Sequence, residues 1–237
     1  YSVIFPFVVI AVSIYCLWKF GINTHFEEWT GRGLYPGLAF AKGFDLYETQ
    51  KGPLITMYGF GMAFFYSFSG LATHPNTAIT IGFLISLLGL MVPFYFILRK
   101  LYKDRENSTL DSISLPLVSA FLVLFCLQLE KTTSGVLKIH ADTPALSFIL
   151  IGLCFFQLYE SKKLNTFLFL TALSLSLAVW SKLPTLLALF FPLVYLLLNR
   201  RLKESFTYIL LASLTFIGLS TLIFCVYGFD DVYYYII

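Results

Sequence analysis

Long apolar stretches separated by short charged segments divide the whole chain. A helix needs roughly 17–25 mainly apolar residues to cross the hydrocarbon core of a bilayer. Lipid offers no partner for backbone N–H and C=O groups, so stretches of this kind are expected to be helical. Those that reach or approach this length are Tyr1–Phe20, Pro53–Leu71, Ala78–Leu98, Ile113–Leu129, Thr143–Tyr159, Thr166–Trp180, Pro184–Leu198 and Phe206–Tyr227.

The composition supports the same class of protein. Of the 237 residues, 58% are hydrophobic and only 12% are charged, against about a quarter charged in a soluble domain. A single core cannot hide that much apolar surface, so we expect an all-α integral membrane protein. The net charge of +3 gives no support for a nucleic-acid partner. We expect residues 1–237 to form one domain, the N-terminal part of a longer protein.

The distribution of Lys and Arg predicts the orientation of the crossings. Three loops that alternate onto one side, Arg99–Arg105, Glu160–Lys163 and Asn199–Lys203, together contain nine basic residues. The opposite loops contain only Lys131, Lys138 and Lys182. Because basic loops stay in the cytoplasm, the side that carries the nine basic residues is predicted to be cytoplasmic.

The stretch Pro53–Leu71 decides on which side the first loop, Ile22–Gly52, lies. If this stretch crosses, the first loop falls in the cytoplasm, opposite Asp142. The stretch is rich in Gly and Ser, which are weak formers of a lipid-exposed helix. We therefore expect it to dip into the membrane or lie along it. This leaves about seven crossings, with the N-terminus in the cytoplasm and the first loop outside.

In the first loop, aromatic and apolar residues alternate with charges, a pattern typical of short helices at a membrane surface. We expect its glycines and prolines, among them Gly31, Gly33, Pro36 and Gly43, to break it into pieces. A structured loop at the headgroup level is a place where an enzyme could meet a lipid-borne substrate.

Three acids are candidates for chemistry on the predicted outer side. Glu27 and Glu28 follow the first crossing, where they either face water or supply a general base, a role that partial burial and fixed geometry would favour. Asp142 precedes Thr143 and Pro144, so it either caps a helix N-terminus or belongs to a site. The two interpretations of Asp142 are compatible.

Four residues on the same side, Arg32, Lys51, Lys138 and His140, are cations or can become cations. Such side chains either extend to lipid headgroups or bind a phosphate in a site. Two other polar segments are expected to be structural: His74 in a turn, and Asp230-Asp231 at the start of a polar loop. The chain has no P-loop, GxSxG, HExxH or CxxC motif.

A set of motifs covers nearly the whole chain: the acidic pair Glu27-Glu28, the stretch from Tyr35 to Gly43, Asp45-Leu46-Tyr47, the turn Lys51-Gly52-Pro53, the segment His140-Ala141-Asp142-Thr143-Pro144, and a short helix that ends in a Lys-x-Pro-like turn, Trp180-Ser181-Lys182-Leu183-Pro184. Together these residues resemble the GT-C superfamily of membrane glycosyltransferases, particularly the protein O-mannosyltransferases and lipid A aminoarabinose transferases. The acidic pair is usually Asp-Glu in that family.

The resemblance implies a GT-C-type bundle of about seven transmembrane helices in the cell membrane, with its active site on the extracytoplasmic face. The donor would be a polyprenyl-phosphate sugar, and the acceptor a lipid, a glycan or a protein. Glu27 or Glu28 would act as base, and Asp142 would orient the acceptor or a cation. Arg32, Lys51, Lys138 and His140 would stabilise the departing phosphate. The resemblance implies no firm cofactor, although it leaves room for a divalent cation.

Two other classes of protein compete with this hypothesis. A transporter would carry ionisable residues within its spans, near the middle of the bilayer. The apolar stretches contain almost none, which argues against ion-coupled transport. A non-enzymatic scaffold or lipid-binding subunit needs neither an acidic pair nor a cation for phosphate, and the sequence leaves this alternative open.

Overall fold

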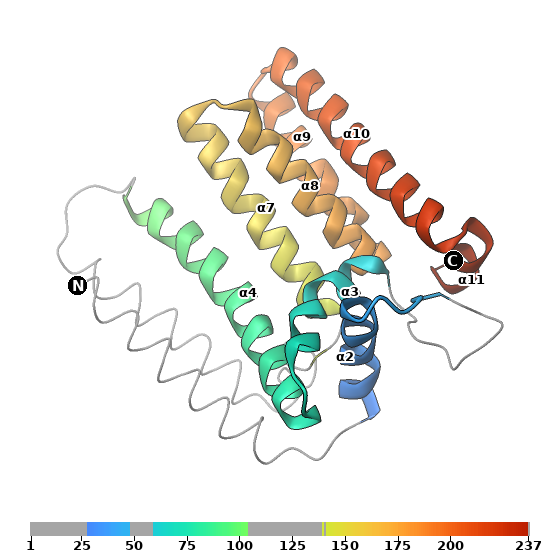
Figure 1. Ribbon diagram of the computed structural model, residues 1–237. Coiled ribbons are helices and arrows are strands. Elements are labelled where there is room, and N and C mark those ends of the chain that lie inside the picture. The colour runs from blue at the N-terminus through green and yellow to red at the C-terminus, as the bar shows by residue number, and fades with distance from the viewer. Residues whose placement is uncertain (1–27, 48–58, 104–138, 140, 237) are drawn as a thin grey trace.

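The computed structural model describes residues 28–47, 59–103, 139 and 141–236, and its regular secondary structure within these ranges is helical, without strands. The longest helices are α4 (Pro75–Lys103), α7 (Asp142–Lys162) and α10 (Leu202–Tyr227), whose axes lie along roughly the same direction (Figure 1). Each contains one of the predicted crossings. The predicted crossings Tyr1–Phe20 and Ile113–Leu129 lie outside the described residues.

These three helices are long and apolar enough to cross a membrane. Their apolar lengths are 23, 21 and 26 residues, and at 1.5 Å per residue each reaches the roughly 30 Å of a hydrocarbon core. In α10 only 11% of the most apolar window is buried by the rest of the chain. Such an apolar exterior is expected where lipid is the solvent, so the fold supports an integral membrane protein.

The next part of the bundle contains a helix break at the predicted Lys-x-Pro turn. Helix α8 (Asn165–Ser181) ends before Lys182, whose backbone is extended with φ −154° and ψ 112°. A 3₁₀-helix, η4 (Leu183–Leu189), follows directly and continues into α9 (Phe190–Leu198). Pro184 at the start of η4 has no N–H to donate, which suits the beginning of a helix.

Three short helices precede α4. They are α2 (Glu28–Ala41), α3 (Phe60–Tyr66) and the 3₁₀-helix η2 (Ser67–Leu71). Together α3 and η2 have 12 residues, or about 20 Å of helix. This is shorter than a hydrocarbon core. Residues 53–58 of the stretch Pro53–Leu71 lie outside the described residues, so the non-crossing interpretation stays a prediction.

The expected breaks in the first loop are only partly correct. Helix α2 runs without interruption through Gly31, Gly33 and Pro36. The turn comes at Gly43, whose φ of +72° favours glycine. Gly33 and Gly37 within α2 serve packing instead, because a Cβ atom would lie 2.0 Å from the carbonyl oxygen of Ile139 at Gly33 and 2.6 Å from the carbonyl carbon of Tyr66 at Gly37.

The contacts fix the directions of the helices. Gly82, Gly89 and Pro93 of α4 approach Ile139, Ser147 and Cys154 in that order, so α4 and α7 are parallel. Helix α8 returns antiparallel to α7, since its last residues adjoin Asp142. Helix α10 runs parallel to α8, because Ser176 and Trp180 pair with Thr215 and Ser220.

After α10 the chain forms one more helix, α11 (Phe229–Ile236). Gly228, with φ +83°, ends α10, and Asp230 and Asp231 occupy the first turn of α11. The expectation that these acids open a polar loop is therefore wrong. Acids in the first turn of a helix interact favourably with its dipole, which explains their position.

Candidate functional site

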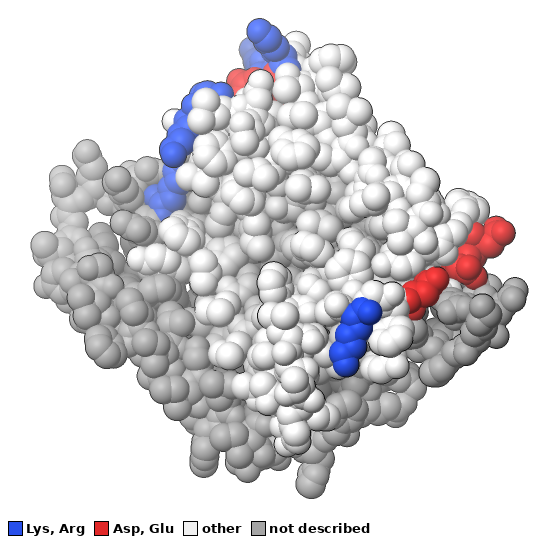
Figure 2. All heavy atoms as spheres, viewed as in Figure 1, with Lys and Arg blue, Asp and Glu red and all other residues white. Residues whose placement is uncertain are grey.

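The charged side chains of the described residues gather at two opposite ends of the bundle. Figure 2 shows a broad band of uncharged residues between them. We call one the Arg201 end and the other the Asp142 end, after their central residues. The Arg201 end carries Lys100, Lys162, Lys163, Arg200, Arg201, Lys203, Glu160 and Glu204, and the Asp142 end carries Lys42, Lys182, Asp45, Asp142, Asp230 and Asp231.

The three basic loops of the sequence thus share one end, as the alternation of crossings predicts. Lys100 donates hydrogen bonds to the carbonyl oxygen of Gln157 at 2.8 Å and to the hydroxyl of Ser161. Arg201 donates to both carboxylate oxygens of Glu160 at 2.7 Å. These contacts join the end of α4, the end of α7 and the start of α10.

At the other end, Asp142 forms an ion pair with Lys182. The two residues are 40 positions apart, and both side chains are partly exposed. The expectation that Asp142 caps α7 is wrong, because Ala141 is the N-cap residue and no side chain caps this helix. A contact with Lys182 directs a carboxylate oxygen of Asp142 toward α8 instead.

Helix α2 packs against the segment that precedes Asp142. A Cβ atom at Gly33 would lie 2.0 Å from the carbonyl oxygen of Ile139, so only glycine permits this approach. Ile139 itself is fully buried beside Leu34. The contact places the backbones of Arg32 and Glu28, in the first two turns of α2, at the Asp142 end.

Helix α3 packs in the same manner against the end of α8. A Cβ at Gly59 would lie 1.8 Å from the carbonyl oxygen of Trp180, and one at Gly61 would lie 2.3 Å from the hydroxyl of Ser181. Lys182 directly follows Trp180 and Ser181 in the sequence. Both members of the ion pair are therefore next to backbone that is fixed by close glycine contacts.

An aromatic cluster supports this end of the bundle. The Tyr47 ring is buried and meets the Tyr227 ring edge-on, with centroids 5.3 Å apart. The same cluster includes Trp180, Ile223 and Val232, from α8, α10 and α11. Burial raises the pKa of Tyr47 far above its ordinary value, so its hydroxyl stays protonated. The cluster ties the Asp45-Leu46-Tyr47 segment to the helices that hold Lys182.

Beside the ion pair is a cavity of about 720 Å³, between the end of α8, η4, α10 and α11. Its walls are mainly apolar and aromatic. Trp180 donates from its indole nitrogen to the Ser220 hydroxyl at 3.2 Å. Lys182 is the charged residue among the described residues that line the cavity. The volume of the cavity is within the range of small-molecule sites.

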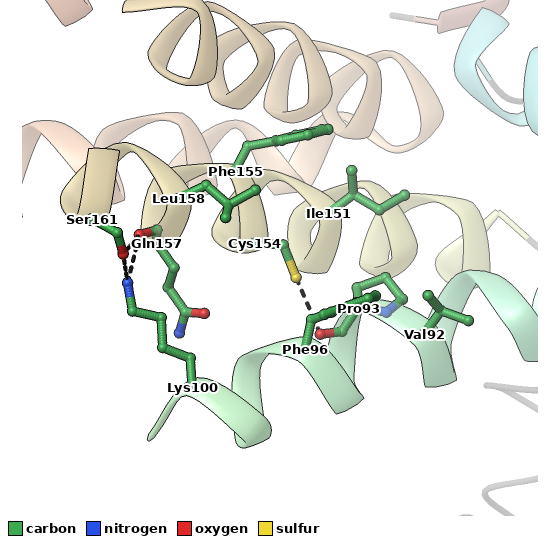
Figure 3. A pocket seen from close by; sticks show the side chains of 10 residues that line it. All are labelled: Val92, Pro93, Phe96, Lys100, Ile151, Cys154, Phe155, Gln157, Leu158 and Ser161. Atoms are coloured by element: carbon green, nitrogen blue, oxygen red, sulfur yellow. Dashed lines mark hydrogen bonds between the residues drawn. The ribbon is translucent and has the colours of Figure 1, made fainter. Parts of the chain in front are cut away.

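A second cavity, of about 620 Å³, lies between α4 and α7 (Figure 3). Its described walls are also mainly apolar, with Lys100 at one edge and the Cys154 sulfur directed to the carbonyl of Pro93 at 3.1 Å. The Lys100 ammonium group is already hydrogen-bonded to α7 near the C-terminus of that helix, where a cation is favourable. Neither cavity has an acid among its described lining residues, but Lys182 of the first cavity is paired with Asp142, so we place the candidate site at the Asp142 end.

The predicted site residues are described unequally. Asp142 is described in full, and Glu28 and Arg32 are described as part of α2 without their side chains. The remaining predicted residues, Glu27, Lys51, Lys138 and His140, lie outside the described residues. Their proposed roles therefore stay predictions. In the described part of the chain, no three His, Cys, Asp or Glu residues gather as a metal site would require.

Lys182 is not among the site residues that the sequence predicts. The sequence predicts its turn, and it predicts that its loop lies on the same side as Asp142. The missing information was that α8 ends beside the start of α7, which only packing determines. An isolated Lys between an apolar helix and Pro184 was the available signal.

The chain was also compared with known proteins. No family model matches it, and no curated protein and no solved structure matches it significantly.

Proposed function

We propose that the chain is a multi-pass membrane glycosyltransferase of the GT-C type, acting on the extracytoplasmic side of the cell membrane. It would transfer a sugar from a polyprenyl-phosphate donor to a hydroxyl or amine of a lipid, glycan or protein. One observation carries the proposal: the Asp142–Lys182 pair adjoins a mainly apolar cavity at the less basic end of the bundle.

This arrangement fits a lipid-borne substrate. The hydrocarbon chain of such a donor stays in the bilayer, while its phosphate and sugar lie at the boundary with water. The Asp142 end offers an apolar cavity and charged groups at the end of the spans. The excess of basic residues at the opposite end favours a cytoplasmic position for that end.

The proposed reaction needs one base and stabilisation of one anion. The acceptor oxygen or nitrogen attacks the anomeric carbon, the bond from that carbon to the phosphate oxygen breaks, and the configuration inverts. Glu27 or Glu28 takes the acceptor proton, and Asp142 orients the acceptor. Arg32, Lys51, Lys138 and His140 are the proposed partners of the departing polyprenyl phosphate.

An ion-coupled transporter is the weaker alternative. The charged residues whose side chains the structure describes lie at the two ends of the bundle, and the middles of α4, α7, α8 and α10 contain none. Ion-coupled transport is expected to place ionisable groups near the middle of the spans. A scaffold without activity is the outcome that the next experiment would identify.

The test is turnover of the donor. The purified protein is incubated with a panel of radiolabelled polyprenyl-phosphate sugars, and release of polyprenyl phosphate is followed. We expect Glu27→Gln or Glu28→Gln, whichever removes the base, to lower the rate by about 10²–10⁴-fold. We expect Asp142→Asn to lower it less, because this residue orients the acceptor and takes no proton.

Asp230→Asn is the matched control, since Asp230 is an exposed acid at the same end, in the first turn of α11. This variant should retain the parental rate. The transferase proposal is wrong if the parent consumes no donor. It is also wrong if Glu27→Gln, Glu28→Gln and Asp142→Asn all act at the parental rate. Binding of a donor without turnover would indicate a lipid-binding scaffold.

A further inference from the structure

We propose that Lys182 binds the phosphate of a long-chain lipid phosphate whose chain enters the cavity between α8, α10 and α11, and that this phosphate displaces Asp142 from Lys182. The inference rests on the proposed function only for the identity of the lipid as a polyprenyl phosphate. It adds a binding residue, a place for the chain and an exchange of partners within the site.

The walls of the cavity match the hydrocarbon chain of such a lipid phosphate. Phe216, Ile217, Phe224, Phe229 and Val232 surround it with aromatic and aliphatic groups from α10 and α11. Phe224 and Phe229 are in contact, with ring centroids 5.1 Å apart. A flexible hydrocarbon chain can fill a cavity of this kind without leaving polar groups unpaired.

The charge of Lys182 at the cavity matches the phosphate of the lipid. Lys182 lines the cavity where α8 breaks, and its side chain is 35% exposed. An ammonium group is a compact cation that binds phosphate as a point charge. An apolar cavity with one cation among its described lining residues, at the end of a membrane bundle, complements an anionic headgroup on a long apolar chain.

The ion pair then becomes part of the binding step. Lys182 is paired with Asp142 in this structure. A phosphate that takes the ammonium group must compete with that carboxylate, so Asp142 opposes binding while it is paired. Once displaced, the carboxylate at the first turn of α7 no longer pairs with Lys182 and can turn to another partner, such as the acceptor. Lipid-phosphate binding and exposure of the Asp142 carboxylate would thus be coupled.

The two residues of the pair should therefore respond in opposite directions. Binding of radiolabelled polyprenyl phosphate is measured with the protein in nanodiscs of neutral lipid. We expect Lys182→Met to weaken binding at least about tenfold, as for the loss of a hydrogen bond to a charged group. We expect Asp142→Asn to tighten binding several-fold, because the competing carboxylate is gone. Lys182→Arg keeps the charge and should retain most of the affinity.

The control variant is Lys163→Met, which makes the same chemical change at the Arg201 end and should leave the affinity unchanged. If Asp142→Asn weakens binding as much as Lys182→Met does, the pair only holds the helices together and the exchange is wrong. A variant that does not fold gives no information about binding, so competition experiments with the parent protein provide a second measurement. Polyprenol, which has the same chain without the phosphate, must compete poorly, and equal competition would overturn the role of the phosphate.

Two further competitors distinguish the source of the phosphate. Inorganic phosphate should compete weakly, because it lacks the chain. Phosphatidylglycerol should also compete weakly, and equal competition would show a general headgroup contact instead of the proposed lipid. The assay measures no turnover, so its outcome is independent of the transferase assay. Specific binding without donor consumption would disprove the proposed function and leave this inference standing.

Discussion

At the scale of residues, the described charges at the Arg201 end form a connected set of ion pairs. Arg201 donates to Glu160 at 2.7 Å and, through Nε, to Glu204 at 2.8 Å. Tyr159 also donates its hydroxyl to Glu204. The hydrogen bond with Glu204 raises the pKa of Arg201 above its ordinary value, so the guanidinium group is charged at every relevant pH. One cation therefore holds two carboxylates, from α7 and α10, together.

We predict that Arg201→Met destabilises the protein strongly, because it leaves Glu160 and Glu204 close together without their shared cation. The Arg201 side chain is only 19% exposed, so a loss on the order of 2 kcal/mol is expected. The measurement is reversible unfolding in mixed micelles with increasing denaturing detergent.

Lys163→Met is the comparison for this variant. Lys163 pairs with Glu160 at 3.3 Å, but its side chain is 51% exposed. An exposed pair contributes roughly 0–1 kcal/mol, so this change should have little effect. Equal losses for Lys163→Met and Arg201→Met would mean that the shared guanidinium group has no special role.

At the scale of elements, α2 and α3 depend on glycine to reach the long helices. We predict that Gly61→Ala destabilises the protein by roughly 1–3 kcal/mol. The added Cβ would lie 2.4 Å from the carbonyl oxygen of Leu177, a backbone atom of α8. Because α3 would have to move away from α8, donor turnover or lipid binding at the adjacent Lys182 should also fall.

Gly218→Ala is a matched control, since a Cβ at Gly218 in α10 would have no neighbour within 4 Å. Ala is the better helix former, by roughly 0.5–1 kcal/mol. We therefore expect an unchanged or higher unfolding free energy in the same micelles. An equal loss of stability in both variants would show that the contact with α8 does not determine the effect.

The sequence predicted some elements well and others poorly, for physical reasons. Apolar length alone located α4, α7 and α10, and a Lys-x-Pro turn located the break after α8. Helix α11 was missed because Asp230-Asp231 suits a loop as well as a first helical turn. The Asp142–Lys182 pair was missed because its members are 40 positions apart. A short-range signal, the preference of Asp for an N-cap, outweighed a long-range contact that no local pattern encodes.

At the scale of the whole molecule, the bundle is polarised. Its Arg201 end has six basic and two acidic residues with described side chains, and its Asp142 end has two basic and four acidic ones, counted from the residues named for each end above. The exposed band between the ends is apolar, as a bilayer requires. This polarity, which Lys and Arg in the loops already indicated, determines a single expected orientation.

We predict that Lys42 and Asp230 face the outside of the cell and that Lys163 faces the cytoplasm. Each is exposed, so each can be replaced by Cys in a chain whose four natural cysteines have been changed to Ser. A membrane-impermeant thiol reagent should label Lys42→Cys and Asp230→Cys in intact cells. It should label Lys163→Cys only after the membrane is opened. The reverse pattern would place the Asp142–Lys182 pair in the cytoplasm, where an extracytoplasmic lipid-phosphate donor could not reach it. Labelling of all three positions from outside would mean that the bundle does not span the membrane.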